Sequence, residues 1–130
     1  MDEERTLSTC ETLIMKTIWD AGKDLSLMEL SALLKERYQK DYARTTIATF
    51  LLKLSEKGFV RTYHKGRNSF IQVIKDEDAY KQRLLKAETD FWYQGSVSRL
   101  ISALYQGEKM PKEEIEALRR ALDVFDGESR

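Results

Sequence analysis

The sequence predicts a mostly α (α+β) protein, with a winged helix-turn-helix domain at residues 1–75 and a three-helix dimerisation domain at residues 76–130. Three observations lead to this fold class. Three amphipathic segments come first, two runs rich in β-branched and aromatic residues then flank a glycine turn, and the remaining segments are apolar on one face only. A chain of 130 residues suits one compact domain, or a small domain with an appendage that needs a partner.

The first three helices are predicted from their caps and their apolar spacing. Two capping-box patterns, Ser8 with Glu11 and Ser26 with Glu29, precede the apolar stripes of the first two helices. A third helix is expected from about Arg44 to Lys57, where Gly58 ends it. The runs "FVRTY" (59–63) and "SFIQVI" (69–74) then predict two strands joined by the turn "HKGRN".

Charge is balanced in total but not along the chain. The protein has 22 Lys and Arg against 22 Asp and Glu. Residues 35–75, by contrast, hold 10 basic and 3 acidic residues, a net charge of +7. A basic stretch within a neutral protein indicates an anionic partner that is bound by one face.

The third helix predicts the nature of that partner. On a helical wheel Ile47, Phe50, Leu51 and Leu54 face the core, which leaves small, hydroxyl-bearing residues outside. Short side chains allow close approach in a major groove, and threonine can contact phosphate, a base edge or a thymine methyl group. A basic hairpin tip suits the DNA backbone or minor groove. The predicted contacts to double-stranded DNA are Arg44, Thr45, Thr46, Ala48, Thr49, Leu52, Lys53, Lys65 and Arg67.

One member of this set has two interpretations. Leu52 lies on the outer face if the helix sits as the wheel predicts, and it belongs to the core if the helix is rotated slightly. The hairpin tip is likewise open to the simpler interpretation of a solubilising basic loop.

The C-terminal helices are short and strongly one-sided, so a second copy of the chain is expected to cover their apolar faces. The aromatic cluster "DFWYQG" fits a dimer contact better than a ligand cage, which would need convergent polar groups. The residues predicted to form the dimer are Phe91, Trp92, Tyr93, Val97, Leu100, Ile101, Leu104, Ile115, Leu118 and Leu122.

Other chemistries find no support in the residue pattern. Cys10 is the single cysteine and His64 the single histidine, and they offer neither a disulfide nor a metal cluster. No phosphate-binding glycine loop or catalytic grouping is present, so neither a cofactor nor enzymatic activity is expected. The sequence contains no signal peptide or membrane-spanning run, which predicts a cytoplasmic protein.

The segments "TTIATFLLKLSEKGFV", "KGR", "GSVSRLISAL" and "MPKEEIEALRRAL" together resemble the penicillinase repressor family, from about Leu7 to Leu122. That family contains bacterial repressors of beta-lactamase, methicillin-resistance and copper-transport genes. The resemblance implies a winged-helix domain, a helical domain that intertwines with its copy, and a homodimer that blocks transcription from a palindromic operator. By position, Thr46 and Thr49 match the family's recognition threonines, Lys53 its arginine position and Arg67 its wing arginine.

The sequence also departs from the family pattern. Ala103-Leu104 stands where the antibiotic-resistance members have a cleavable Asn-Phe bond, and the cysteine cluster of the copper-responsive members is absent. Ala43 and Arg44 replace the residue that usually caps the recognition helix, so Asp41 is expected to take over the cap. Two alternatives to the plain repressor are a winged-helix module that binds proteins and a repressor with a small-molecule pocket at the dimer junction.

Overall fold

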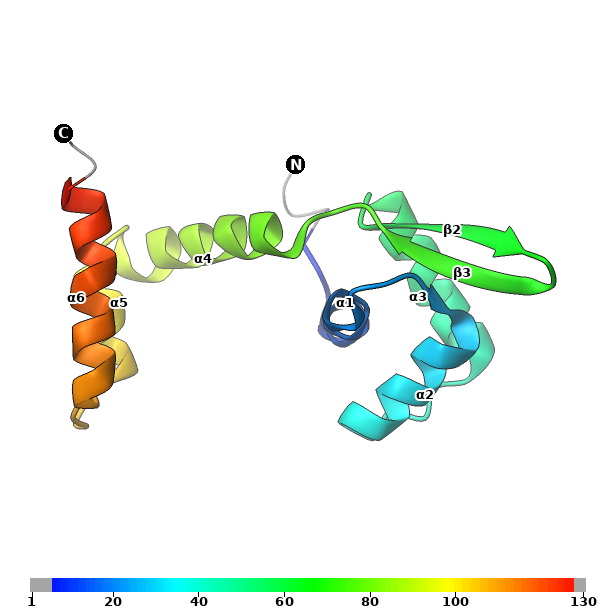
Figure 1. Cartoon of the computed structure of the whole chain (residues 1–130), viewed down its shortest axis with the longest axis horizontal. Helices are drawn as coiled ribbons and strands as arrows, with labels where there is room; N and C mark the ends of the chain where they lie inside the picture. Colours follow the sequence, from blue (N-terminus) through cyan, green and yellow to red (C-terminus); the bar gives the residue numbers. More distant parts are fainter. Residues whose placement is uncertain (1–5, 128–130) are drawn as a thin grey trace. The chain divides into compact units, whose positions relative to one another are not determined.

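The computed structural model describes residues 6–127, and within this range six helices and a three-stranded sheet form in the predicted order, which confirms the mostly α (α+β) class (Figure 1). Two compact units are separated between Gln82 and Arg83. The elements are α1 (Thr9–Ala21), β1 (Leu25–Ser26), α2 (Leu27–Tyr38), α3 (Arg44–Glu56), β2 (Val60–Lys65), β3 (Asn68–Val73), α4 (Glu77–Tyr93), α5 (Val97–Leu104) and α6 (Lys112–Gly127).

Both predicted capping boxes form. The Ser8 hydroxyl accepts the Glu11 N–H at 3.2 Å, and the Glu11 carboxylate accepts the Ser8 N–H at 2.8 Å. Ser26 and Glu29 repeat the exchange at 3.1 and 2.9 Å. Because each box pairs two backbone donors that would otherwise lack partners, the starts of α1 and α2 are fixed by local sequence.

The sheet has the strand order β1-β3-β2, and both pairings are antiparallel. Strands β2 and β3 pair from Val60 opposite Val73 to Lys65 opposite Asn68. Gly66 opens their turn at φ 67°, a positive value that a side chain would strain and that two-residue hairpin turns require. The two-residue strand β1 was not predicted, because it exists only through its pairing with β3.

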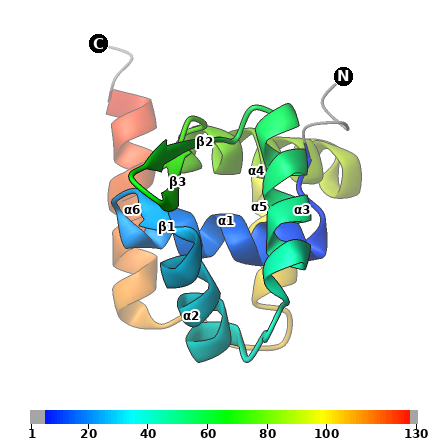
Figure 2. The same ribbon diagram turned by 90° about the vertical axis from the view of Figure 1, so that its right-hand side faces the viewer.

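The core of the first unit lies where the three N-terminal helices meet the sheet, an arrangement visible in Figure 2. Each helix contributes the apolar face that its spacing predicts, and the strands add residues from one side of the sheet. The most deeply buried apolar side chains are Ile14, Met15, Ile18, Leu25, Leu30, Leu34, Ile47, Leu54, Phe59 and Ile71.

An aromatic cluster extends this core to the first turns of α4. The Tyr80 ring lies 5.3 Å from that of Phe59, edge to face, and 5.8 Å from that of Trp19, measured between ring centroids. The Tyr80 hydroxyl accepts the Leu7 N–H at 3.2 Å, and the Trp19 indole donates to the Lys75 carbonyl at 2.9 Å. The start of α4 is therefore packed as part of the first unit.

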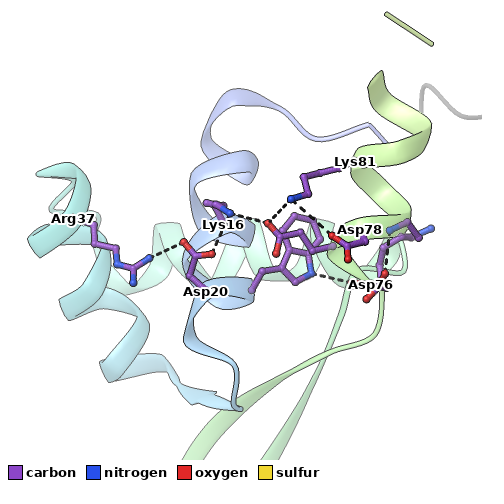
Figure 3. A network of polar contacts seen from close by, with 10 residues as sticks. Lys16, Asp20, Arg37, Asp76, Asp78 and Lys81 are labelled. Carbon is purple, nitrogen blue, oxygen red and sulfur yellow. Dashed lines mark hydrogen bonds and ion pairs between the residues drawn. The ribbon is translucent and has the colours of Figure 1, made fainter. Parts of the chain in front are cut away.

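A surface network of charged side chains links α1, α2 and α4 (Figure 3). Lys16 on α1 contacts Asp20 at 3.1 Å and Glu77 at 2.8 Å, and Arg37 on α2 contacts Asp20 at 3.1 Å. Lys81 reaches Glu77 at 3.7 Å. These side chains are partly exposed, so each pair contributes at most about 1 kcal/mol, and the buried aromatic contacts dominate the packing here.

A more deeply buried ion pair joins α1 to the end of α3. The Glu11 side chain is only 2% exposed, and its carboxylate lies 2.6 Å from the Lys57 ammonium, which also donates to the Thr6 carbonyl at 2.9 Å. Burial acts to raise the pKa of Glu11, but the Lys57 ammonium and the hydrogen bonds from Ser8 outweigh it, so this pKa lies below its ordinary 4.5.

Lys57→Met should lower the free energy of unfolding at pH 7 by about 2–3 kcal/mol, because it leaves a buried carboxylate without its cation. A carboxyl whose pKa is depressed by folding stabilises the protein above its unfolded pKa, and this contribution is lost as the pH falls through the folded value. The deficit of the variant should therefore shrink as the pH falls from 7 to 4. Urea unfolding at both pH values measures this deficit in the free energy of unfolding. The control is Lys16→Met, which removes an exposed lysine. A deficit of equal size at pH 4 and pH 7 would contradict this account.

Candidate nucleic-acid interface

Helix α3 turns its predicted outer face to solvent. Ile47, Leu51 and Leu54 are buried against the core, and Phe50 is half-buried beside the Tyr42 ring. The seven predicted DNA contacts on this helix are all exposed: Arg44, Thr45, Thr46, Ala48, Thr49, Leu52 and Lys53. The helical wheel therefore predicted the orientation of α3 well, although it placed Phe50 deeper than it is.

The start of α3 has no side-chain cap. Ala43 occupies the N-cap position, and no side chain accepts a hydrogen bond from the first turn. The expectation that Asp41 would take over the cap is therefore wrong, because its carboxylate accepts no hydrogen bond from the first turn of α3. The backbone N–H groups of this turn keep their partial positive charge, which is the property that lets a helix start hold a phosphate.

The outward threonines differ in what they can offer to a partner. The Thr49 hydroxyl donates to the Thr45 carbonyl one turn earlier, at 3.0 Å. Its proton is therefore engaged, and it presents a methyl group and an oxygen lone pair to the outside. Such a side chain suits a thymine methyl group or an amino group on a base edge.

Ala48 and Leu52 lie on the side of α3 that faces the hairpin. Leu52 is 61% exposed, which excludes the interpretation of a rotated helix with Leu52 in the core. Together with Thr62 and Ile71 of the hairpin, these two residues line a hollow of about 240 Å³. A helical wheel gives the angle of a residue about the axis, but it cannot show which neighbouring element that angle faces.

The hairpin tip brings Arg67 toward the start of α3. Lys65 and Arg67 are exposed, and Arg67 lines a second hollow, of about 280 Å³, together with Arg44, Ser26 and Asn68. The sequence predicted both arginines as DNA contacts, whereas Ser26 and Asn68 were not predicted to lie in this site. The local pattern assigned Ser26 only to a helix cap and Asn68 only to the turn, because folding alone brings them beside the two arginines.

The basic side chains at the end of α3 and on the hairpin differ in whether another residue of the chain already bonds them. Arg61 is bonded to Gln72 at 2.9 Å and lies over the Tyr63 ring, and Lys57 is held by Glu11. No ion pair or hydrogen bond from the side chains of Arg44, Lys53, Lys65 or Arg67 is formed within residues 6–127. The unengaged cations are thus the ones that a polyanion could bind without breaking existing contacts.

The second unit exposes most of its apolar side chains. No side chain of α5 or α6 is buried. Of the predicted dimer residues, Phe91, Trp92, Val97, Leu104 and Leu122 are exposed, and Tyr93, Leu100, Ile101, Ile115 and Leu118 are half-buried. The sequence prediction stopped short of Val124 and Phe125, which are 56% and 78% exposed and extend the apolar surface of α6.

The described residues provide little for other chemistries. Between residues 6 and 127 no three His, Cys, Asp or Glu side chains gather in a way that could hold a metal ion. Cys10 accepts a hydrogen bond from the Tyr42 hydroxyl at 3.3 Å, an interaction that raises the pKa of Tyr42. None of the helices in this part of the chain is long and apolar enough to cross a membrane.

In the first unit three helices are followed by an antiparallel hairpin with a basic tip, which is the order of elements that the sequence predicted. A search among curated proteins finds no significant match to the sequence. The family model of the penicillinase repressor, however, matches residues 7–124, nearly the whole chain. The chain therefore belongs to the penicillinase repressor family, whose members are transcriptional repressors rather than enzymes.

Proposed function

We propose that this protein is a homodimeric transcriptional repressor that binds a palindromic operator in double-stranded DNA, acts in the cytoplasm and catalyses no reaction. The single observation that carries the DNA-binding part is that four unengaged cations lie on the exposed face of α3 and at the tip of the hairpin, two of them, Arg44 and Arg67, beside the uncapped start of α3. These cations are Arg44, Lys53, Lys65 and Arg67. A charge pattern of this kind favours a polyanion with regularly spaced phosphates.

The threonine face of α3 supplies sequence recognition in this proposal. Thr45, Thr46 and Thr49 project from the first two turns, where short side chains let the backbone enter a major groove. Leu52 and Ala48 flank this face on the hairpin side. The N–H groups at the start of α3 hold one phosphate, and Lys65 and Arg67 of the hairpin contact the neighbouring backbone or minor groove.

Dimerisation follows from the energetics of the second unit. Residues 83–127 form three helical segments with exposed apolar faces and without a buried side chain in α5 or α6. A unit this small cannot be stable without covering those faces, and a second copy of the chain can cover them symmetrically. Two copies then place two α3 helices in successive major grooves, with half-sites about 10–10.5 bp or a multiple of that apart.

Arg67→Ala tests the proposed DNA contact of the hairpin. The substitution should weaken binding to every duplex and reduce the slope of log affinity against log salt by about one unit, because one phosphate contact is lost. Gel-shift titrations at 50 and 200 mM salt measure both effects. The matched control is Arg61→Ala, which removes an arginine of the same hairpin that is engaged with Gln72.

The control should leave the salt slope nearly unchanged. If Arg67→Ala left it unchanged as well, the hairpin would have no part in DNA binding. If the wild-type protein ignored duplex DNA altogether but bound another protein, the chain would act as an interaction module instead.

A further inference from the structure

Two adjoining hollows form a groove beside α3 and the β-hairpin, and lining residues such as Leu27, Leu51 and Ile71 have no part in the proposed DNA contacts. It consists of the two hollows described above, of about 240 and 280 Å³, which share Leu27 and Ser69 as lining residues. Small-molecule sites in proteins are commonly clefts of roughly 300–1,000 Å³. The combined groove has room for a ligand of one or two rings.

One end of the groove is apolar. Leu27, Leu51, Leu52 and Ile71 provide most of its wall, and the hydroxyl-bearing Ser55 and Thr62 also line it. Leu52 remains 61% exposed, so its contact with water is an unfavourable feature that an apolar ligand would remove. A sugar–phosphate backbone would bring charge rather than apolar surface to this end.

The other end of the groove is basic and polar. Arg44 from α3 and Arg67 from the hairpin both line it, and Ser26, Asn68 and Ser69 add hydrogen-bonding groups. Neither arginine side chain is bonded to another residue within 6–127. On the first turn of α2, Glu29 already accepts the Ser26 N–H and pairs with Lys23 at 3.6 Å. The cationic groups are therefore available to an anion.

We propose that the groove binds a small organic acid, with its ring system in the apolar hollow and its carboxylate between Arg44 and Arg67. Guanidinium groups bind planar carboxylates with paired hydrogen bonds, which fixes the orientation of the acid. A bound acid occupies the same two arginines that the operator needs, so it excludes DNA. The exclusion of DNA by the acid rests on the proposed function, whereas binding of the acid does not.

Calorimetric titration of the full chain with 2-naphthoate, in the absence of DNA, tests the site. The acid should bind, and its neutral analogue 2-naphthamide should bind about tenfold more weakly, because it cannot form the charge-assisted hydrogen bonds. Arg67→Ala should also weaken binding of the acid about tenfold. Ser55→Leu, which fills the apolar hollow, should abolish it. Arg61→Ala is the matched control on the same hairpin and should bind the acid as the wild type does.

Two outcomes would overturn the proposal: no heat of binding with millimolar 2-naphthoate, or equal affinity in wild type, Arg67→Ala and Ser55→Leu with thermal melts that show all three folded. A gel shift with and without the acid then tests the competition. The acid should release DNA from the wild type but not from Ser55→Leu. If the acid binds and the protein ignores DNA, the proposed repressor function fails alone. If DNA binds normally and the acid does not, only this site fails.

Discussion

Leu104→Asp should convert the proposed dimer to a monomer at low micromolar concentration and weaken operator binding by about 100-fold or more. Leu104 is 67% exposed and is the last residue of α5, on the apolar face that we assign to the dimer. A carboxylate buried there would lose its hydration without gaining a partner. Operator affinity depends on two half-sites bound at once, and a linked second site commonly contributes a factor of 10²–10⁴.

Sedimentation equilibrium and a gel shift on the same preparations measure the two effects. The matched control is Ser102→Asp, which adds the same charge to an exposed position of α5. Ser102→Asp should remain dimeric and bind the operator nearly as the wild type does. A Leu104→Asp protein that stays dimeric would show that the apolar face of α5 is covered in another way.

Tyr80→Ala should lower the free energy of unfolding of the first unit by about 3–5 kcal/mol, the usual cost of removing a large buried aromatic side chain. Tyr80 is 7% exposed, and its ring packs on Phe59 and Trp19. Its loss would leave a cavity beside two other aromatic rings. The same substitution should accelerate proteolysis near the start of α4, because that turn loses its anchor.

Tyr80→Phe is the control for the hydroxyl group. It keeps the ring contacts and removes the hydroxyl that accepts the Leu7 N–H, so it should cost about 1 kcal/mol. Urea unfolding monitored by tryptophan fluorescence compares the three proteins. A loss below 1 kcal/mol in Tyr80→Ala would show that α4 starts independently of the first unit.

The local features of this fold were predictable from sequence because short segments specify them. The Ser8 and Ser26 capping boxes, the apolar stripes of α1 to α3 and the Gly66 turn each depend on residues within a few positions of one another. Features that depend on distant pairing were missed. Strand β1 exists through β3, and Glu11 was recognised as part of a cap but not as the buried partner of Lys57, 46 residues away.

The candidate site likewise combines features that the sequence predicts with features that depend on distant residues. The exposed face of α3 follows from helical periodicity, so its threonines and Leu52 could be named in advance. The grouping of Arg44 with Arg67, Ser26 and Asn68 could not, since three separate elements supply these residues. Tyr80 likewise packs into the core of the first unit against distant residues, and no local sequence pattern predicts this contact.

The most direct test of the central claim is the mass of the complex between the full chain and DNA from upstream of its own gene, measured alongside a scrambled duplex of equal length. We expect two copies per duplex at 50 mM salt, with the upstream sequence bound at least about 1,000-fold more tightly than the scrambled one. We also expect protected sites one helical turn, or a multiple of it, apart. Equal affinity for both duplexes, or a complex with a single copy, would contradict the account.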